Sequence, residues 1–469
     1  MHATGKKKFR LFDAVLAAVC IILVVEAAAP SAAIGNSQYF WWILLLVAFF
    51  LPYGLVSAEL GTTYTGEGGL FDWVKRAFGR KWGSRVAWYY WVNFALWMAS
   101  LAVLGTGVVE QAFGITIPLY VALPAQLAFI WIVSYLSNHS VAENAILINI
   151  ATVFKIIIMV ALGVLGIYFA VTHGVANPVE SPVDLLPGIT GISFIAVIIF
   201  NFLGFEVVTT FAGEMENPKK QIPKALLLGG ILVAFFYIFA SFGIGVAIPV
   251  DQINPDSGLL DSFTMFFEGL GISSVFLIII ALMFIYTLVI NLLSWALGVN
   301  YVAMYAADNS ALPKVFGKRK KGTDDIPFGA SMVNGVVASI LVLIAPVITA
   351  VTGNDEMFWS FFALQIITLL TSYIILFPTF LKLRRIDPDA ERPFKVGGGP
   401  VLLNIITWVP LVLLILSVFF CIAWPEEEGW VVDWTLLAGS VVAFVAGEII
   451  AVFSGRNVKK ENENERIAS

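Results

Sequence analysis

The stretch that decides the fold is residues 21–36, IILVVEAAAPSAAIGN, where a glutamate, three alanines, a proline and a serine interrupt an apolar run. A second apolar run, residues 196–214 (AVIIFNFLGFEVVTTFAGE), is interrupted in the same way by Asn201, Gly204 and Glu206. Proline removes a backbone donor, and glycine weakens a helix. Irregular backbone at membrane depth is tolerated only where it lines a cavity, so both runs are expected to be discontinuous helices beside a central site.

The composition is that of a membrane protein. Of the 469 residues, 59% are hydrophobic and only 13% are charged, and the mean hydropathy is +0.90. A water-soluble domain needs more polar surface than this, and a spanning helix needs about 20 apolar residues. The sequence therefore predicts an all-α membrane protein of twelve transmembrane helices, at 11–34, 39–60, 83–109, 118–137, 145–171, 188–213, 223–248, 271–305, 328–351, 358–380, 402–424 and 432–453.

The two interrupted runs fall at corresponding points of the two halves, which is the pattern of an inverted-repeat transporter with its site at the midplane. Because no sequence identity between the halves is visible, this prediction depends on spacing alone. The first repeat is expected over 11–171 (helices 1–5) and the second over 188–380 (helices 6–10). The last two helices follow at 402–453, between a cytoplasmic N-terminus (1–10) and a polar cytoplasmic tail (454–469) without regular structure.

The basic residues predict the orientation of the chain. With the N-terminus inside, all but one of the 27 Lys and Arg fall in segments on the cytoplasmic side. The opposite loops collect acids instead: Asp251, Asp256 and Asp261 in one, and Glu426–Glu428 in another. An excess of Lys and Arg marks the cytoplasmic side. We therefore expect a multi-pass protein of the cell (inner) membrane with both termini in the cytoplasm, and a short interfacial helix within 66–80 on that side.

Four ionisable residues are predicted to lie inside the membrane: Glu26, Glu59, Glu206 and Lys155. A charge at the bilayer centre costs at least ~2.5–3.5 kcal/mol, so such residues are usually paired or functional. Three acids against one lysine leave an excess of negative charge, which protons or a bound cation must compensate. The alternative is that the acids are protonated, hydrogen-bonded structural groups.

Four motifs, in order, resemble the amino acid–polyamine–organocation transporters: SAELGTTYTGEGGLFDWVKRAFG, FAGEMENPKKQIPKAL, YAADNSALPKVFGK and LKLRRIDPDAERPFKV. The resemblance covers essentially the whole chain, and it implies a LeuT-like five-plus-five inverted repeat with discontinuous helices 1 and 6 and alternating access. The spelling of helix 6 is similar to the plant-type polyamine permeases. The region with LPYGLVSAELGTTY is similar both to them and to the bacterial agmatine:putrescine and glutamate:γ-aminobutyrate exchangers.

One departure from the family pattern indicates the cargo. Amino acid carriers of this family have a Gly-Ser-Gly type break in helix 1, whose bare amides bind the substrate carboxylate. Here that position falls on Val24-Val25-Glu26, so a carboxylate stands near where a substrate carboxylate would lie. Two like charges there would repel strongly, whereas a cationic amine would be attracted. This favours an amine as substrate.

The same resemblance suggests roles for individual residues. Glu26 and Glu206 are expected to hold amine ends, and Lys155 matches a lysine that some proton-coupled members carry in helix 5. Lys155 and Glu59 are candidates for proton coupling or gating, although Glu59 could simply anchor the neighbouring loop and Lys155 could be a static structural cation. An aromatic face attracts a cation by its quadrupole. The remaining candidates for substrate contact are Trp295, Phe200, Phe202, Asn201, Gly204, Tyr90 and Trp97.

The function predicted from these observations is a secondary transporter of cationic amines, an agmatine/putrescine-type antiporter. Two alternatives stay open: an amino acid antiporter of the glutamate:γ-aminobutyrate kind, with Glu26 protonated, and a proton-coupled polyamine uptake permease. No enzyme is expected, because His2, His139 and His173 lack metal-ligand spacing and the glycines form no phosphate-binding loop. No cofactor, metal or nucleic acid is expected, and the predicted partners are a small cationic amine and the lipid bilayer.

Overall fold

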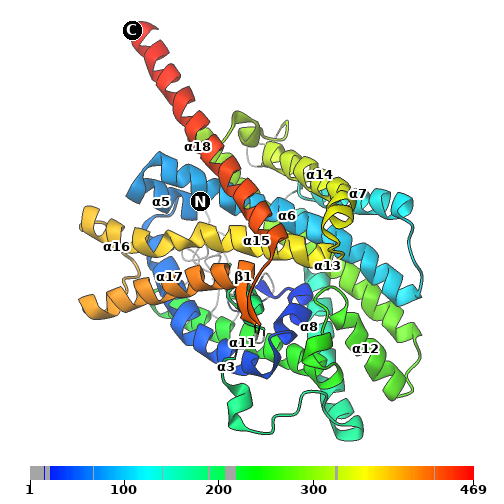
Figure 1. Ribbon diagram of the computed structural model, residues 1–469. Coiled ribbons are helices and arrows are strands. Elements are labelled where there is room, and N and C mark those ends of the chain that lie inside the picture. The colour runs from blue at the N-terminus through cyan, green and yellow to red at the C-terminus, as the bar shows by residue number, and fades with distance from the viewer. Residues whose placement is uncertain are drawn as a thin grey trace, which may run out of the picture.

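The structure is almost entirely helical (Figure 1). The computed structural model describes residues 15, 19, 22–66, 68–139, 141–188, 191–205, 218–322, 326–426 and 428–468. Within these residues the α-helices are α2 (Ala28–Ala32), α3 (Gln38–Leu45), α4 (Leu51–Thr63), α5 (Leu70–Phe78), α6 (Arg80–Phe113), α7 (Leu119–Leu136), α8 (Val141–His173), α9 (Ile195–Asn201), α11 (Pro218–Ala247), α12 (Gly258–Gly269), α13 (Val275–Asp308), α14 (Phe328–Thr352), α15 (Met357–Ile374), α16 (Leu376–Ile386), α17 (Pro400–Ile422) and α18 (Trp434–Ala468).

Short helical turns and one hairpin complete the described chain. The hairpin pairs β1 (Ala423–Glu426) antiparallel with β2 (Gly429–Val432), and places Ala423 opposite Val432. The turns are η1 (Val25–Ala27), η2 (Gly35–Ser37), η3 (Leu46–Phe50, a π-helical turn), η4 (Pro182–Leu185), η5 (Ile192–Phe194), η7 (Val250–Gln252) and η8 (Lys314–Gly317).

Ten helices of the described part are long and apolar enough to cross a membrane. They match ten of the twelve predicted stretches. The two predicted stretches without a long helix, 11–34 and 188–213, are the ones that the sequence interrupts. In the first, Leu23 and Val24 are not helical; in the second, α9 ends at Asn201 and residues 206–217 lie outside the described part.

Helices α6 and α15 pack along each other in the middle of the bundle, and α11 packs along α8 (Figure 1). Helix α13 contacts both α6 and α8, while α9 lies against α15 and α17. The long apolar helices bury their common faces and leave large apolar side chains exposed on the outside of the bundle, as a protein solvated by lipid does. This packing brings the two interrupted segments to the interior, where η1 contacts α8 and α13.

The helix predicted within 66–80 is present as α5, which buries Leu70, Phe71 and Val74, and its place at the membrane interface stays a prediction. It belongs to the end of the bundle where the basic loops meet. There Lys75 Nζ donates to Asn309 Oδ1 (2.5 Å), and Arg80 donates to the carbonyl of Ser310 (2.9 Å). The described basic segments that follow α4, α13 and α16 therefore share one end of the molecule.

Two expectations about the chain beyond α17 need correction. The predicted loop at 425–431 contains the β1–β2 hairpin, which was not expected in an all-α protein. The tail was expected to have no regular structure, but α18 continues to Ala468 and projects from the bundle as its last segment (Figure 1). The reason is local, because the sequence NVKKENENERIA contains many Lys, Glu and Arg, which have good helix propensity even without tertiary contacts.

Candidate functional site: a buried carboxylate between two broken helices

The interruption of the first broken helix, at Val24, is stabilised by Tyr237 of α11. Val24 is extended (φ −120°, ψ 122°) and precedes the turn η1, so the helical backbone is interrupted at this residue. The hydroxyl of Tyr237 accepts from Val24 N–H at 2.9 Å and donates to the Val24 carbonyl at 3.0 Å. Buried backbone groups need partners, and Tyr237 supplies both. The break at Val24 is therefore a stable feature of the fold.

Glu26 lies in the turn η1 that follows this break and is only 3% exposed. Asn291 of α13 donates from Nδ2 to Glu26 Oε1 at 3.0 Å. Lys155 of α8 donates from Nζ to Asn291 Oδ1 at 2.8 Å. Among the described residues, the carboxylate thus accepts from a neutral side-chain amide, and the Lys155 cation lies on the far side of that amide.

The second broken helix ends in a glycine that approaches an aromatic ring. After α9, Gly204 adopts φ +97°, and its N–H donates to the Tyr53 hydroxyl at 3.1 Å. A Cβ at this position would lie 2.7 Å from Cη2 of Trp295. The positive φ and the close ring both require a residue without a side chain. Gly204 and Trp295, both candidates from the sequence, are therefore in contact.

An aromatic cluster extends from this contact. Trp295 meets Trp97 with ring centroids 5.8 Å apart, and Trp97 meets Phe200 at 5.8 Å. Phe200 in turn meets Phe362 of α15 at 5.5 Å. Each pair is near edge-to-face, a favourable arrangement for aromatic rings. These four rings form the aromatic wall of the candidate site.

Polar atoms without partners lie beside this wall. Asn201, at the end of α9, donates to Ser31 Oγ at 3.4 Å, but its Oδ1 has no partner among the described residues. The indole N–H of Trp97 is close enough to Glu26 to act on its charge, yet it falls short of a full hydrogen bond. Buried polar atoms without partners are rare in folded proteins and mark places where a ligand or water binds.

Two predicted contact residues, Phe202 and Tyr90, contact rings outside the aromatic wall. Phe202 is fully buried against Trp42 and Phe50, with ring centroids 5.2 and 5.0 Å away. Tyr90 contacts Tyr373, which belongs to a second group of rings that includes Tyr53. Glu206 lies outside the described residues.

Glu59 has a different environment from Glu26, although it is only 1% exposed. Arg384 contacts both of its oxygens, with Nε 2.8 Å from Oε1, and Arg392 Nε lies 3.3 Å from Oε1. The N–H of Val396 donates to Oε2 at 2.7 Å. Two guanidinium groups and a backbone donor tie α4 to α16 and to the loop that follows α16, at the basic end. This geometry fits the anchoring role that the sequence left open.

An acidic cavity of about 790 Å³ opens at the other end of the bundle. No Lys or Arg is among its described lining residues. Beside it, Trp359 N–H donates to Asp256 Oδ1 at 3.1 Å. Burial, together with the charge of Glu356, raises the pKa of Asp256 to about 7. The acids and aromatic residues that line the cavity are Asp251, Glu356, Glu426, Glu428, Asp433, Phe194, Trp359 and Trp424.

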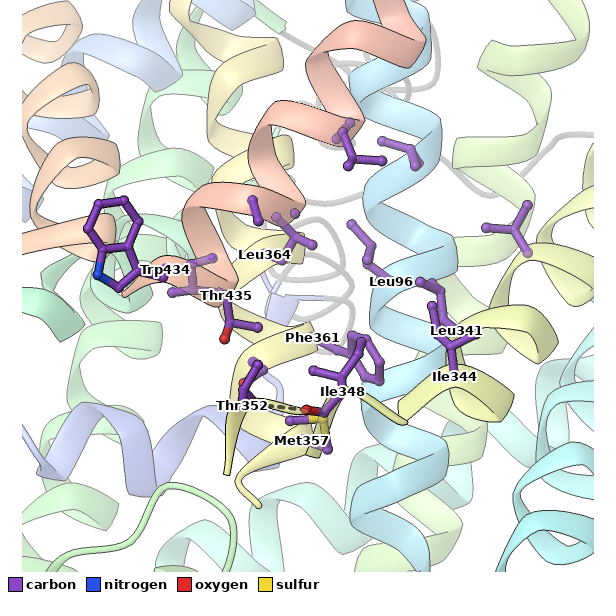
Figure 2. Close-up of a pocket in the computed structure, with 18 of the residues that line it drawn as sticks. Leu96, Leu341, Ile344, Ile348, Thr352, Met357, Phe361, Leu364, Trp434 and Thr435 are labelled. Carbon is purple, nitrogen blue, oxygen red and sulfur yellow. Dashed lines mark hydrogen bonds between the residues drawn. The ribbon is translucent and has the colours of Figure 1, made fainter. Parts of the chain in front are cut away.

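A second large groove, of about 760 Å³, lies between α6, α14, α15 and α18 and is almost wholly apolar (Figure 2). Leu96, Leu341 and Ile344 lie on one side of it in Figure 2, and Trp434 and Leu364 on the other. It has no charged lining residue in the described chain. This groove fits lipid hydrocarbon rather than a charged substrate, so the polar site at the broken helices is the functional candidate.

Comparison with known proteins agrees with this architecture. A model of the amino acid permease family matches residues 9–453. The chain belongs to this family. It is 48% identical, over 95% of both chains, to the probable agmatine/putrescine antiporter AguD of Lactococcus lactis. It is 24% identical to a glutamate/gamma-aminobutyrate antiporter of the same species, over 81% of this chain and 76% of the relative, and 24% identical to the polyamine transporter RMV1 of Arabidopsis thaliana, over 78% and 70%.

Membership of the permease family makes this chain a multi-pass membrane transporter and not an enzyme. The sequence alone missed Asn291, Tyr237 and Phe362, which contact residues of the candidate site, and it did not single out Gln365. Gln365 of α15 is fully buried, and neither polar atom of its amide has a partner among the described residues. A buried amide in an apolar helix was the available signal for Asn291 and Gln365, whereas nothing local distinguishes Tyr237 or Phe362 from packing residues.

Proposed function

We propose that this permease is an antiporter of small cationic amines of the agmatine and putrescine type. The observation that carries the proposal is the buried Glu26 carboxylate at the helix 1 break, beside an aromatic wall. A buried carboxylate attracts an ammonium or guanidinium group and repels a substrate carboxylate. The name of the relative at 48% identity, a probable agmatine/putrescine antiporter, supports the same substrate class.

In this proposal Glu26 binds one amine end, and Glu206 is kept as the candidate for the other. Trp295, Trp97 and Phe200 stack around the carbon chain, and Asn201 Oδ1 accepts from an ammonium N–H. A ring face holds a cation by its quadrupole, an effect of about 2 kcal/mol or more when the cation is desolvated. We leave Phe202 out of the contact set because its ring packs against Trp42 and Phe50. We also leave Tyr90 out of the contact set, because its ring packs against Tyr373.

We further propose that the transport cycle is alternating access between two inverted repeats, 11–171 and 188–380, followed by 402–453, with twelve crossings in total. The two broken helices support this proposal, because short half-helices at a central site can move separately. Lys155 would couple helix 5 to the Glu26 site, and the ion pairs of Glu59 would close the basic end.

The separation of basic and acidic residues supports an orientation of the protein in the membrane. The basic end would face the cytoplasm, together with the segments 1–10 and 454–469, because Lys and Arg are retained on that side of the cell (inner) membrane. The acidic cavity would then face outward. A cleft lined by one sign of charge raises the local concentration of the opposite ion, which here is a cationic amine.

Counterflow in proteoliposomes tests the proposal. Liposomes with the purified protein are loaded with agmatine, putrescine, arginine, glutamate or buffer, and uptake of labelled putrescine is measured. We expect stimulation by internal agmatine or putrescine but not by glutamate, and its loss in Glu26→Gln. The exposed Glu391→Gln, at the basic end, is the matched control and should behave as the wild type.

Two results would replace the proposal. Exchange of glutamate without putrescine uptake under any load would identify an amino acid antiporter of the glutamate/gamma-aminobutyrate kind. Putrescine uptake that follows a proton gradient and is indifferent to internal amine would identify a polyamine uptake permease.

A further inference from the structure

The side-chain amide of Asn291 links three elements at the centre of the bundle. Asn291 is on α13, and it bonds to Lys155 on α8 and to Glu26 in η1. Asn291 is fully buried, and Glu26 and Lys155 are each 3% exposed. The described contact between the cation and the carboxylate therefore runs through one neutral amide.

The charges at its two ends fix the orientation of this amide. Its oxygen faces the Lys155 ammonium at 2.8 Å, and its nitrogen faces Glu26 Oε1 at 3.0 Å. The flipped amide would place NH₂ against an ammonium and oxygen against a carboxylate, so neither bond would form. Asn291 is thus oriented by the very two groups that it separates.

The separation matters because Lys155 and an amine substrate carry the same chemical group. An ammonium in direct contact with Glu26 would satisfy the carboxylate and compete with the ammonium of the substrate. A neutral donor stabilises the carboxylate without cancelling its charge. The field of the nearby lysine still lowers the penalty of burying Glu26.

We propose that Asn291 is a specificity-determining positioning residue, which holds the Lys155 ammonium one amide away from Glu26 and keeps that carboxylate available to a cationic amine. The inference rests on the proposed function and adds to it a residue that acts through Glu26. It explains how one site contains both a cation and a carboxylate that binds cations.

Equilibrium binding of labelled putrescine to the detergent-purified protein tests this role without requiring transport. In Asn291→Leu the bridge is lost and Lys155 approaches Glu26 directly, so the Kd for putrescine should rise at least about tenfold. In the double variant Asn291→Leu/Lys155→Met the competing ammonium is gone, and the Kd should fall back toward the wild-type value. This recovery is not expected if Asn291 only packs the core.

A matched control comes from the same helix. Asn300 is also a buried asparagine of α13, but it accepts a bond from Asn334 (2.6 Å). Asn300→Leu should change the melting temperature without changing the Kd for putrescine. If Asn291→Leu does not fold, Asn291→Ser takes its place, because serine is too short to reach both partners. The double variant is then Asn291→Ser/Lys155→Met.

The outcomes separate the two proposals. A wild-type protein that binds no putrescine overturns the proposed function and this inference with it. A wild-type protein that binds putrescine, with a single variant of unchanged Kd or a double variant no better than the single one, overturns the role of Asn291 alone.

Discussion

Glu26 and Glu59 are both almost fully buried, but their partners differ in charge. Glu59 contacts two arginines and a backbone N–H at the basic end. Glu26 accepts from the neutral amide of Asn291 and lies near the indole N–H of Trp97. The carboxyl group of Glu59 is therefore paired with two cations, whereas that of Glu26 contacts a neutral amide. A cationic ligand could pair with Glu26, whereas the oxygens of Glu59 already contact two arginines.

The largest expected effect comes from removing the ion pairs of Glu59 with Arg384 and Arg392. Glu59→Gln leaves the Arg384 and Arg392 guanidinium groups without their counter-charge, and breaking a buried ion pair in this way costs about 3–5 kcal/mol. We expect the lower part of this range, because the Arg384 side chain is 15% exposed. Thermal unfolding in detergent should show a clear drop in melting temperature, with putrescine affinity of the folded fraction preserved. An unchanged melting temperature with lost affinity would make Glu59 a functional group instead.

The mirror-image substitution should affect binding rather than folding. Glu26→Gln keeps an oxygen that accepts from Asn291 Nδ2, so the fold loses little. The amine loses its counter-charge, and a hydrogen bond to a charged group contributes about 1.5–3 kcal/mol, or roughly 10- to 150-fold in Kd. Calorimetric titration with putrescine and thermal unfolding measure the two effects separately. Equal behaviour of the Gln variants at positions 26 and 59 would refute the contrast between the two regions.

A smaller effect tests whether Trp295, which contacts Gly204, belongs to the Glu26 site. Gly204→Ala forces an L-residue into φ +97° and pushes a methyl toward Trp295, for a strain of about 1–2 kcal/mol. Because Trp295 belongs to the aromatic wall, the half-saturation concentration for exchange should rise. Gly107→Ala in α6, where a Cβ meets nothing within 4 Å, is the control and should be silent. A silent Gly204→Ala would exclude Trp295 from the site.

A pH-dependent effect concerns a third acid, Asp256, whose neighbour Glu356 is another acid. The pKa of Asp256 is raised from 3.8 to about 7, so the native state holds a proton that the unfolded chain has released between these values. The unfolding free energy should therefore fall as pH rises from about 4 to 7 and level off above. Asp256→Asn keeps an acceptor for Trp359 N–H and should flatten this slope in melting temperatures measured from pH 4 to 8. An identical slope in the variant would assign it to other groups.

The amino-acid sequence determined the lipid-facing class of the protein, because apolar runs of spanning length have no other stable environment. It also located the interruptions: Val24 is extended and α9 ends at Asn201, as proline, glycine and polar residues in those runs predicted. The segregation of basic loops predicted which segments share an end, and α5 was predicted from its helical spacing. These properties depend on the order of residues along the chain, so they can be predicted from the sequence alone.

The environment of each site residue was decided only by the tertiary structure. Asn291 lies 265 positions from Glu26, and Tyr237 lies 213 positions from Val24. Phe200 and Phe202 are two residues apart, yet one joins the aromatic wall and the other packs against Trp42. The local sequence around Glu26 and Glu59 does not give the charge of their partners, because the partner of a buried carboxylate comes from another part of the chain. Whether a charge is neutralised or kept for a ligand is therefore settled by helix packing.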